Sequence, residues 1–267
     1  MLLPGATHSG LSTMVKRLLQ GLLNRSGYHV IRLSSGGMYE SILPLATYAP
    51  WNSSAEFRAV WTAVRNNTLV DIFRCWELWQ LVGQTTKLSG SFIEVGVWRG
   101  GTGALIASAA KQNGIATPLY LCDTFQGVVK SGIHDSAYKG GEHADTSIPT
   151  VEALMKSLGL TNYRIVEGIF PDATSHLIPA SERFRLCHID VDVYESARDI
   201  VDWLWSRVVL GGLVVYDDYG FEVCPGITRL VNEQMGMSDR LVFHNLNGHA
   251  IVMKLRESVT SRMSPST

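Results

Sequence analysis

From residue 91 to residue 254, short apolar runs alternate with stretches of helical periodicity, and this alternation constrains the fold more than any other feature. The predicted strands cover 91–97, 118–125, 162–170, 185–192 and 211–219, and the predicted helices cover 102–112, 149–158, 194–207 and 226–235. Such alternation is typical of βαβ units around a mostly parallel sheet. Two last runs, 240–246 and 249–254, predict a terminal hairpin with one antiparallel strand. The sequence therefore predicts an α/β fold with seven strands and helices on both faces.

The first 66 residues differ from the rest of the chain. The first acidic residue is Glu40, although four basic residues precede it, and residues 14–25 form a basic amphipathic pattern. We expect this helix to dock on the body or on a second subunit, and contact with a membrane surface is the alternative. A long helix is predicted over 68–87. The predicted organisation is thus an N-terminal helical extension (1–66), one α/β domain (67–256) and a disordered tail (257–267).

The overall composition excludes several classes of partner. The formal net charge is −1 and the sequence contains no strongly basic patch, so no nucleic-acid partner is expected. No apolar run is long enough for a transmembrane helix, and the N-terminus lacks the pattern of a signal peptide. The 4 cysteines form no CxxC pair, which favours buried thiols over disulfides or zinc. We therefore expect a protein of the reducing cytoplasm.

A glycine-rich turn, EVGVWRGGTG (94–103), follows the first strand and opens a helix. Glycine lets the backbone turn tightly and approach a ligand closely. Asp123 ends the second strand, where an acidic residue of a doubly wound fold hydrogen-bonds ribose hydroxyls. The two features together predict a ligand of the adenosine type, and Glu94 suits a ligand that carries an amino group or a positive charge. The alternative is a tight turn without a ligand.

Two pairs of aspartates lie at the ends of apolar strands. Asp190 and Asp192 end the fourth strand, and Asp217 and Asp218 end the fifth. Ligands of such sheets bind beyond the carboxyl ends of the strands, so four carboxylates are expected to converge there. Their repulsion requires a cation, and hard oxygen ligands favour Mg²⁺ over zinc. The alternative is that these residues are helix N-caps and surface charges.

Four segments together carry a resemblance to a known family: FIEVGVWRGG, CDTFQG, HIDVDVYES and VVYDDY. They resemble the TylF/MycF-type (macrocin) O-methyltransferases of antibiotic biosynthesis, which are class I enzymes with a Rossmann-like fold that use S-adenosylmethionine and Mg²⁺. The resemblance runs from about Thr68 to Lys254. Two departures are Val191 and Glu195, which stand in DVDVYES where the family usually has glycine and a small residue, and residues 1–66 match no part of the family.

The resemblance implies roles for individual residues. The methionine end of the cofactor would be held by Glu94, Gly96, Val97, Trp98, Arg99 and Gly100. The ribose and adenine would lie at Asp123, Thr124, Phe125, Ile169 and Phe170. Thr68, at the opening of the long helix, and Ser147 would contact the carboxylate or the edge of the cofactor. Asp190, Asp217 and Asp218 would bind Mg²⁺, and Asp192 would be the general base.

The activity that the resemblance implies is methylation of a hydroxyl of a sugar or glycosylated natural product, either a secondary metabolite or a polysaccharide. The polar segment 131–147, with His134 and His143, is a candidate lid. We also expect a homo-oligomer, with residues 1–66 acting as a lid over the acceptor or as a contact between subunits. The alternatives are a relative similar to cephalosporin hydroxylases, a non-catalytic partner that binds the cofactor, and a nicotinamide oxidoreductase. Glu94 and the missing GxGxxG spacing argue against the last of these.

Overall fold

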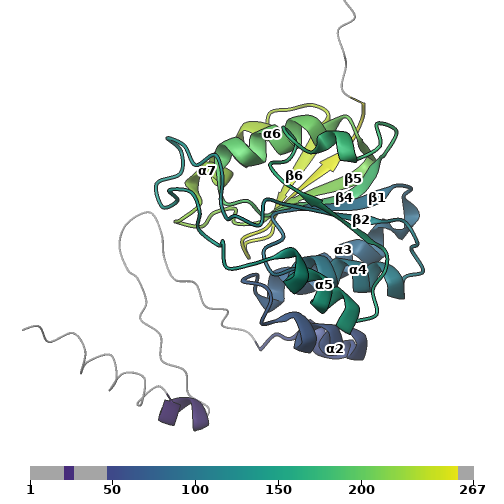
Figure 1. Cartoon of the computed structure of the whole chain (residues 1–267), viewed down its shortest axis with the longest axis vertical. Helices are drawn as coiled ribbons and strands as arrows, with labels where there is room; N and C mark the ends of the chain where they lie inside the picture. The colour runs from purple at the N-terminus through teal and green to yellow at the C-terminus, as the bar shows by residue number, and fades with distance from the viewer. Residues whose placement is uncertain (1–20, 27–46, 258–267) are drawn as a thin grey trace, which may run out of the picture. The chain divides into compact units, whose positions relative to one another are not determined.

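Seven strands form one sheet with the order β3-β2-β1-β4-β5-β7-β6 in a computed structural model that describes residues 21–26 and 47–257 (Figure 1). The strands are β1 (Ser91–Val95), β2 (Leu119–Asp123), β3 (Tyr163–Glu167), β4 (Phe184–Ile189), β5 (Val208–Tyr216), β6 (Arg240–His244) and β7 (Ala250–Lys254). Only β7 runs antiparallel to its neighbours, β5 and β6. The predicted mostly parallel sheet with a terminal antiparallel hairpin is therefore confirmed.

Helices cover both faces of this sheet (Figure 1). They are α2 (Ala55–Val64), α3 (Ile72–Gln84), α4 (Gly101–Gln112), α5 (Ile148–Ser157), α6 (Tyr194–Trp205) and α7 (Pro225–Gln234), and three short 3₁₀ turns are η1 (Pro50–Ser53), η2 (Thr85–Lys87) and η3 (Ser175–Leu177). One hydrophobic core lies between helices α2, α3, α4 and α5 and one face of the sheet. A second core lies between α6 and α7 and the other face. The central strands are therefore buried on both sides, which explains why they appear as continuous apolar runs.

The helix predicted over 68–87 begins four residues later than expected, at Ile72. Asp71 caps it, because its carboxylate accepts hydrogen bonds from the backbone amides of Phe73 and Arg74 at 2.8 and 3.1 Å. Thr68 does not open the helix; it lies in the preceding turn, where its hydroxyl accepts a hydrogen bond from the amide of Val70 at 3.0 Å. The side chain of Thr68 is therefore placed by this turn.

The compact α/β unit begins at Ala49 rather than after residue 66. Helix α2, which was expected in the N-terminal extension, packs on α3 and α4. Phe57 of α2 is fully buried, and its ring meets Trp76 and Trp79 of α3 edge-on at 4.9 and 5.7 Å. Residues 49–66 are thus part of the α/β unit.

Most of the predicted basic helix at 14–25 and nearly all of the predicted tail at 257–267 lie outside the described residues; residues 21–25 are helical. All four cysteines are buried with free thiols, as predicted. Across residues 21–26 and 47–257, the structure contains no helix with the length and apolar character needed to cross a membrane.

Candidate functional site

A cavity of about 260 Å³ opens at the carboxyl ends of β1, β2, β4 and β5. Its wall includes the glycine-rich turn after β1, the end of β2, the aspartates after β4 and β5, and the segment before α3. Parallel strands all end at this edge, so their terminal residues meet here although they are distant in the sequence.

The glycine-rich turn is tightly packed against the end of β4. Gly96 has φ +89°, and a Cβ atom at this position would lie 1.6 Å from the carbonyl oxygen of Asp190. Only glycine fits this backbone and this contact. The turn is also held from the other side, because the amide of Gly101 donates a hydrogen bond to the carbonyl of Asn67 at 2.9 Å. The first turn of α4 therefore joins the sheet to the segment before α3.

Asp123 fixes the same turn to the end of β2. One carboxylate oxygen accepts hydrogen bonds from the amides of Val97 and Trp98 at 2.6 and 2.9 Å, and the other accepts from the amide of Phe125 at 2.7 Å. The residue lines the cavity, where the sequence predicted a ribose ligand. The carboxylate thus organises the backbone of the turn and also faces the predicted cofactor position.

The structure brings seven of the thirteen predicted cofactor residues to the cavity wall. These are Thr68, Gly96, Val97, Trp98, Asp123, Thr124 and Phe170, whereas Glu94, Arg99, Gly100, Phe125, Ser147 and Ile169 are not in its lining. Ser147 instead caps α5, because its side chain accepts a hydrogen bond from the amide of Thr150. Arg99 forms an ion pair with Asp145 at 2.5 Å. These two side chains hold the surroundings of the cavity together.

The predicted convergence of aspartates is present in the structure. Oxygens of Asp190, Asp217 and Asp218, which we call the carboxylate centre, lie within 4.8 Å of one another. The backbone places them: the amide of Asp190 donates to Val95 at 2.9 Å, and the amide of Asp217 donates to Ile189 at 3.0 Å. Both aspartate pairs directly follow their strands rather than ending them, which corrects the predicted strand ends by a few residues.

Arg74 of α3, a basic residue to which the sequence gave no role, lies against the carboxylate centre. The guanidinium of Arg74 forms an ion pair with Asp217 and lies 3.6 Å from an oxygen of Asp218. Its other side pairs with Asp71 at 2.9 Å. The first turn of α3 therefore delivers a positive charge to the acidic edge of the sheet.

The protonation of the carboxylate centre follows from burial and charge. Burial raises the pKa of Asp190 and Asp218, and the neighbouring charge of Asp217 raises both further. Burial alone would raise the pKa of Asp217 as well, but the neighbouring imidazoles of His188 and His249 and the charge of Arg74 lower it. Asp217 is thus the aspartate that stays charged, and the other two would gain from an additional cation.

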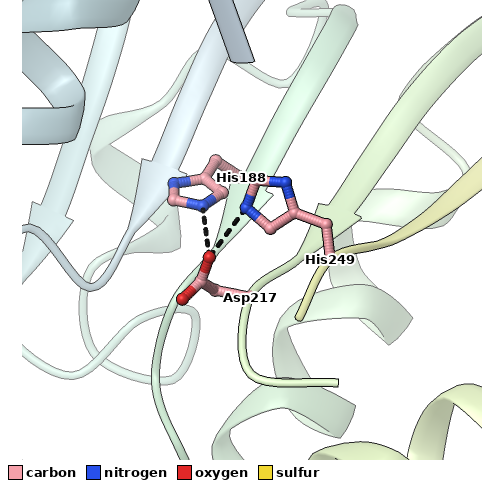
Figure 2. A group of neighbouring side chains, drawn as sticks. All are labelled: His188, Asp217 and His249. Atoms are coloured by element: carbon pink, nitrogen blue, oxygen red, sulfur yellow. Dashed lines mark hydrogen bonds and ion pairs between the residues drawn. The ribbon is translucent and has the colours of Figure 1, made fainter. Parts of the chain in front are cut away.

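Two buried histidines face Asp217 (Figure 2). The Nε2 atoms of His188 and His249 lie 3.8 and 2.7 Å from the same oxygen of Asp217. Burial alone would lower the pKa of His188, but the neighbouring carboxylates of Asp217 and Glu94 raise it to about 10. Glu94 is fully buried in this pairing, with its Oε1 atom 2.9 Å from Nδ1 of His188.

Asp192, the predicted base, lies in the cavity wall beside the carboxylate centre. The hydroxyl of Tyr138 donates a hydrogen bond to its carboxylate at 2.7 Å, and Sγ of Cys224 is 3.7 Å from the same oxygen. Burial raises the pKa of Asp192, which makes the carboxylate a stronger base. Such a group can accept a proton from a bound hydroxyl.

The candidate lid at 131–147 is tied to the cavity at several points. Besides the contact of Tyr138, the indole of Trp98 donates a hydrogen bond to Asp145 at 2.9 Å, and Thr146 donates to the carbonyl of Trp98. His143 lines the cavity and its ring contacts Trp98, whereas His134 packs against Tyr194 at 4.8 Å. The segment thus forms one wall of the site.

Sequence reasoning missed Arg74, Glu77, His249 and Tyr138, and it gave His188 no role. Only His188 carried a local signal, since it interrupts an apolar strand two positions before Asp190. The other four lie on a helix, in a loop or before the last strand, where a polar residue is ordinary.

A family of known proteins matches most of the chain that builds this site. A model of the family "Macrocin-O-methyltransferase (TylF)" matches residues 66–244. A Streptomyces olivaceus protein, 8-demethyl-8-(2,3-dimethoxy-alpha-L-rhamnosyl)-tetracenomycin-C 4'-O-methyltransferase, is 26% identical over 190 residues, which are 67% of this chain and 70% of that protein. Mycinamicin III 3''-O-methyltransferase of Micromonospora griseorubida is 28% identical over 165 residues, 57% of this chain and 64% of the other.

Solved structures share the fold. The O-methyltransferase NovP superposes with a TM-score of 0.61 at 24% identity, over 71% of this chain and 83% of NovP. The calicheamicin methyltransferase CalS11 superposes with a TM-score of 0.58 at 14% identity, over 83% of this chain and 99% of CalS11. Because the family match spans the strands and turns that build the cavity, this chain belongs to the macrocin O-methyltransferase family and is an O-methyltransferase, an enzyme class that depends on S-adenosylmethionine.

Proposed function

We propose that this enzyme transfers a methyl group from S-adenosylmethionine to a hydroxyl of a sugar or glycosylated natural product, with Mg²⁺ at the carboxylate centre. The observation that carries the proposal is the set of three carboxylates, Asp190, Asp217 and Asp218, that share one cavity with the glycine-rich turn and with Asp192. The names of two relatives, which methylate a rhamnosyl tetracenomycin and mycinamicin III, support an acceptor of this class.

The residues of the carboxylate centre fit a hard divalent cation. Their oxygens lie within 4.8 Å of one another, and oxygen ligands are those that Mg²⁺ prefers. Burial and mutual repulsion raise the pKa of Asp190 and Asp218, so both would be stabilised by a further positive charge. A metal there would compete with Arg74 for Asp217.

The cavity fits S-adenosylmethionine along its other wall. Gly96, Val97 and Trp98 line the end toward β1, and Asp123 lines the end of β2, where a ribose would meet its carboxylate. Phe170 offers an apolar surface for an adenine ring. Glu94 and Ser147 lie outside this wall, so we propose that they act by holding His188 and the start of α5 rather than by touching the cofactor.

In this proposal the protein supplies the base and the alignment. When bound, S-adenosylmethionine supplies the reactive methyl group and Mg²⁺ orients the acceptor oxygens and lowers the hydroxyl pKa. Asp192 accepts the proton of the hydroxyl, and Tyr138, which donates to Asp192 at 2.7 Å, holds that carboxylate in place. The wall formed by 131–147 excludes water. The N-terminal extension as a lid over the acceptor or a contact between subunits stays a prediction.

The proposal is tested by methyl transfer to a panel of glycosylated acceptors, measured by mass spectrometry with Mg²⁺ and with EDTA. Asp192→Asn should lower kcat by about 10²- to 10⁴-fold, the usual contribution of a general base, while calorimetry still detects S-adenosylhomocysteine binding. Asp190→Asn should abolish the effect of Mg²⁺. Asp202→Asn, an exposed aspartate of α6, is the control and should match the wild type.

Each part of the proposal can fail separately. An enzyme that binds no S-adenosylhomocysteine would refute the cofactor site. Equal rates with Mg²⁺ and EDTA would refute the metal and leave Arg74 as the cation of the carboxylate centre. Full activity of Asp192→Asn would remove the base from Asp192.

A further inference from the structure

Behind the carboxylate centre, four polar side chains form a row across four neighbouring strands. Glu94 lies in β1, His188 lies in β4, Asp217 follows β5 and His249 precedes β7. Each lies two positions from a residue of the core beneath α2 to α5, so all four point to the same face of the sheet. Their exposed fractions are 0, 0, 2 and 0%. A row of this kind is costly to bury unless its charges are compensated.

A carboxylate holds the Nδ1 side of each histidine. Nδ1 of His188 lies 2.9 Å from Glu94, and Nδ1 of His249 lies 2.6 Å from Glu77 of α3. A carboxylate at Nδ1 accepts the ring N–H, which leaves the lone pair of a neutral imidazole on Nε2. This pairing is the arrangement that orients metal-binding histidines in proteins.

Both Nε2 atoms point to one oxygen of Asp217 (Figure 2). Nε2 of His249 lies 2.7 Å from this oxygen and Nε2 of His188 lies 3.8 Å from it. Nε2 of His188 is fully buried and makes no hydrogen bond with any residue that the structure describes. With both imidazoles neutral, two lone pairs and a carboxylate oxygen would repel one another, so a positive charge, either a proton or a metal ion, is needed between them.

The side chains around the two histidines are mostly acidic, which also favours a cation between them. Glu77, Glu94 and Asp217 adjoin the histidines, and Asp190 and Asp218 lie next to Asp217 on its other side. Arg74 is the guanidinium that pairs with this group, and it contacts the other oxygen of Asp217. Among the residues that the structure describes, one arginine does not balance Glu77, Glu94 and Asp217, so the pair of imidazoles is favourably placed to hold a cation.

We propose that Nε2 of His188, Nε2 of His249 and one oxygen of Asp217 bind a divalent transition metal such as Zn²⁺, separate from the carboxylate centre. The three donor atoms lie within 4.8 Å of one another. Imidazole nitrogen favours Zn²⁺ and related metals over Mg²⁺, and bond lengths of about 2.0–2.2 Å require only small shifts of these buried rings.

The site has an entry path and a function within the fold. Asp217 lines the cavity, so a metal can reach the histidines from that side. Because its second oxygen faces Arg74 and Asp218, Asp217 would connect the two sites, and the buried metal would fix its orientation. The inference does not depend on the identity of the acceptor or on methyl transfer.

The test is the visible absorption of Co²⁺ added to chelator-treated full-length enzyme in excess Mg²⁺, followed by displacement with Zn²⁺. Four- or five-coordinate Co²⁺ with nitrogen ligands absorbs strongly, whereas six-coordinate Co²⁺ bound by oxygen absorbs weakly. We expect a strong band in the wild type, in Asp190→Asn and in His176→Gln, an exposed histidine that serves as the control. His249→Gln should abolish the band, and Glu77→Gln should weaken Co²⁺ binding by about 10- to 100-fold, as is usual for loss of an outer-shell partner.

Two results would overturn the proposal. If wild-type enzyme shows only the weak spectrum, protons on the histidines provide the positive charge instead. If the strong band persists in His249→Gln but disappears in Asp190→Asn, the metal belongs to the carboxylate centre. Should His249→Gln fail to fold by circular dichroism, the wild-type spectrum and Glu77→Gln still decide the question.

Discussion

Gly96 and Asp217 are the two residues at which the site tolerates the least change. The backbone at Gly96 touches the carbonyl of Asp190, and this contact sets the distance between the glycine-rich turn and the carboxylate centre. Asp217 receives Arg74 on one oxygen and two histidines on the other. Both positions are therefore defined by contacts that arise only when β1, β4 and β5 lie side by side.

Gly96→Ala should lower the free energy of unfolding by about 3 kcal/mol or more, because the new methyl group would overlap the carbonyl of Asp190. Gly141→Ala is the matched control: its φ is +88°, against +89° at Gly96, but it has open space around it. The control should cost only about 1–2 kcal/mol, the cost of a left-handed alanine. Urea denaturation measures both values, and equal losses would contradict the steric explanation.

Helix α3 is the element that connects the acidic edge of the sheet to the rest of the chain. Its N-cap, Asp71, also pairs with Arg74, and its next turn supplies Glu77 to His249. Its other face packs against α2 through Trp76 and Trp79. Periodicity predicted this helix, but the capping residue rather than periodicity sets its start, so the predicted boundary was four residues too early.

Phe57→Ala should lower the free energy of unfolding of the whole α/β unit by about 3–5 kcal/mol, because it removes a fully buried ring between α2 and α3. Arg58→Ala, at an exposed position of the same helix, should change it by no more than about 0.5 kcal/mol. Thermal unfolding followed by near-ultraviolet circular dichroism reports the change. A separate N-terminal domain would instead leave the main transition of Phe57→Ala where it is in the wild type.

At the scale of the whole molecule, ion pairs between distant segments hold the loops against the sheet and its two hydrophobic cores. Lys130, at the start of the wall 131–147, forms ion pairs at 2.7 Å with both Asp172, after β3, and Asp199 of α6. Burial alone would raise the pKa of Asp199, but hydrogen bonds from Lys130 and Arg198 lower it. This cluster therefore makes the stability of the fold depend on pH.

Lys130→Met should destabilise the fold by on the order of 1 kcal/mol near pH 7, as is typical of a partly exposed ion pair. Because the pKa of Asp199 is lower in the folded state, its contribution is present above the unfolded value of about 3.9 and is lost as the pH falls through the folded value. The difference from the wild type should thus shrink toward pH 3. Urea denaturation at both pH values, with Lys156→Met as an exposed control, measures it. A difference that is independent of pH would rule out this linkage.

The alternation of strands and helices in the sequence was enough to predict the fold class, because the period of apolar residues indicates which face of each element is buried. It also placed four aspartates at one edge, because parallel strands share the direction in which they end. Tertiary structure decided the rest. Arg74 and His249 reach Asp217 from the start and the end of the domain, and Glu77 holds His249 in place. Such contacts leave no periodic pattern in the sequence. Tertiary structure likewise decided that Glu94 pairs with His188 rather than lining the cavity, because the register of β1 and β4 sets these two residues side by side.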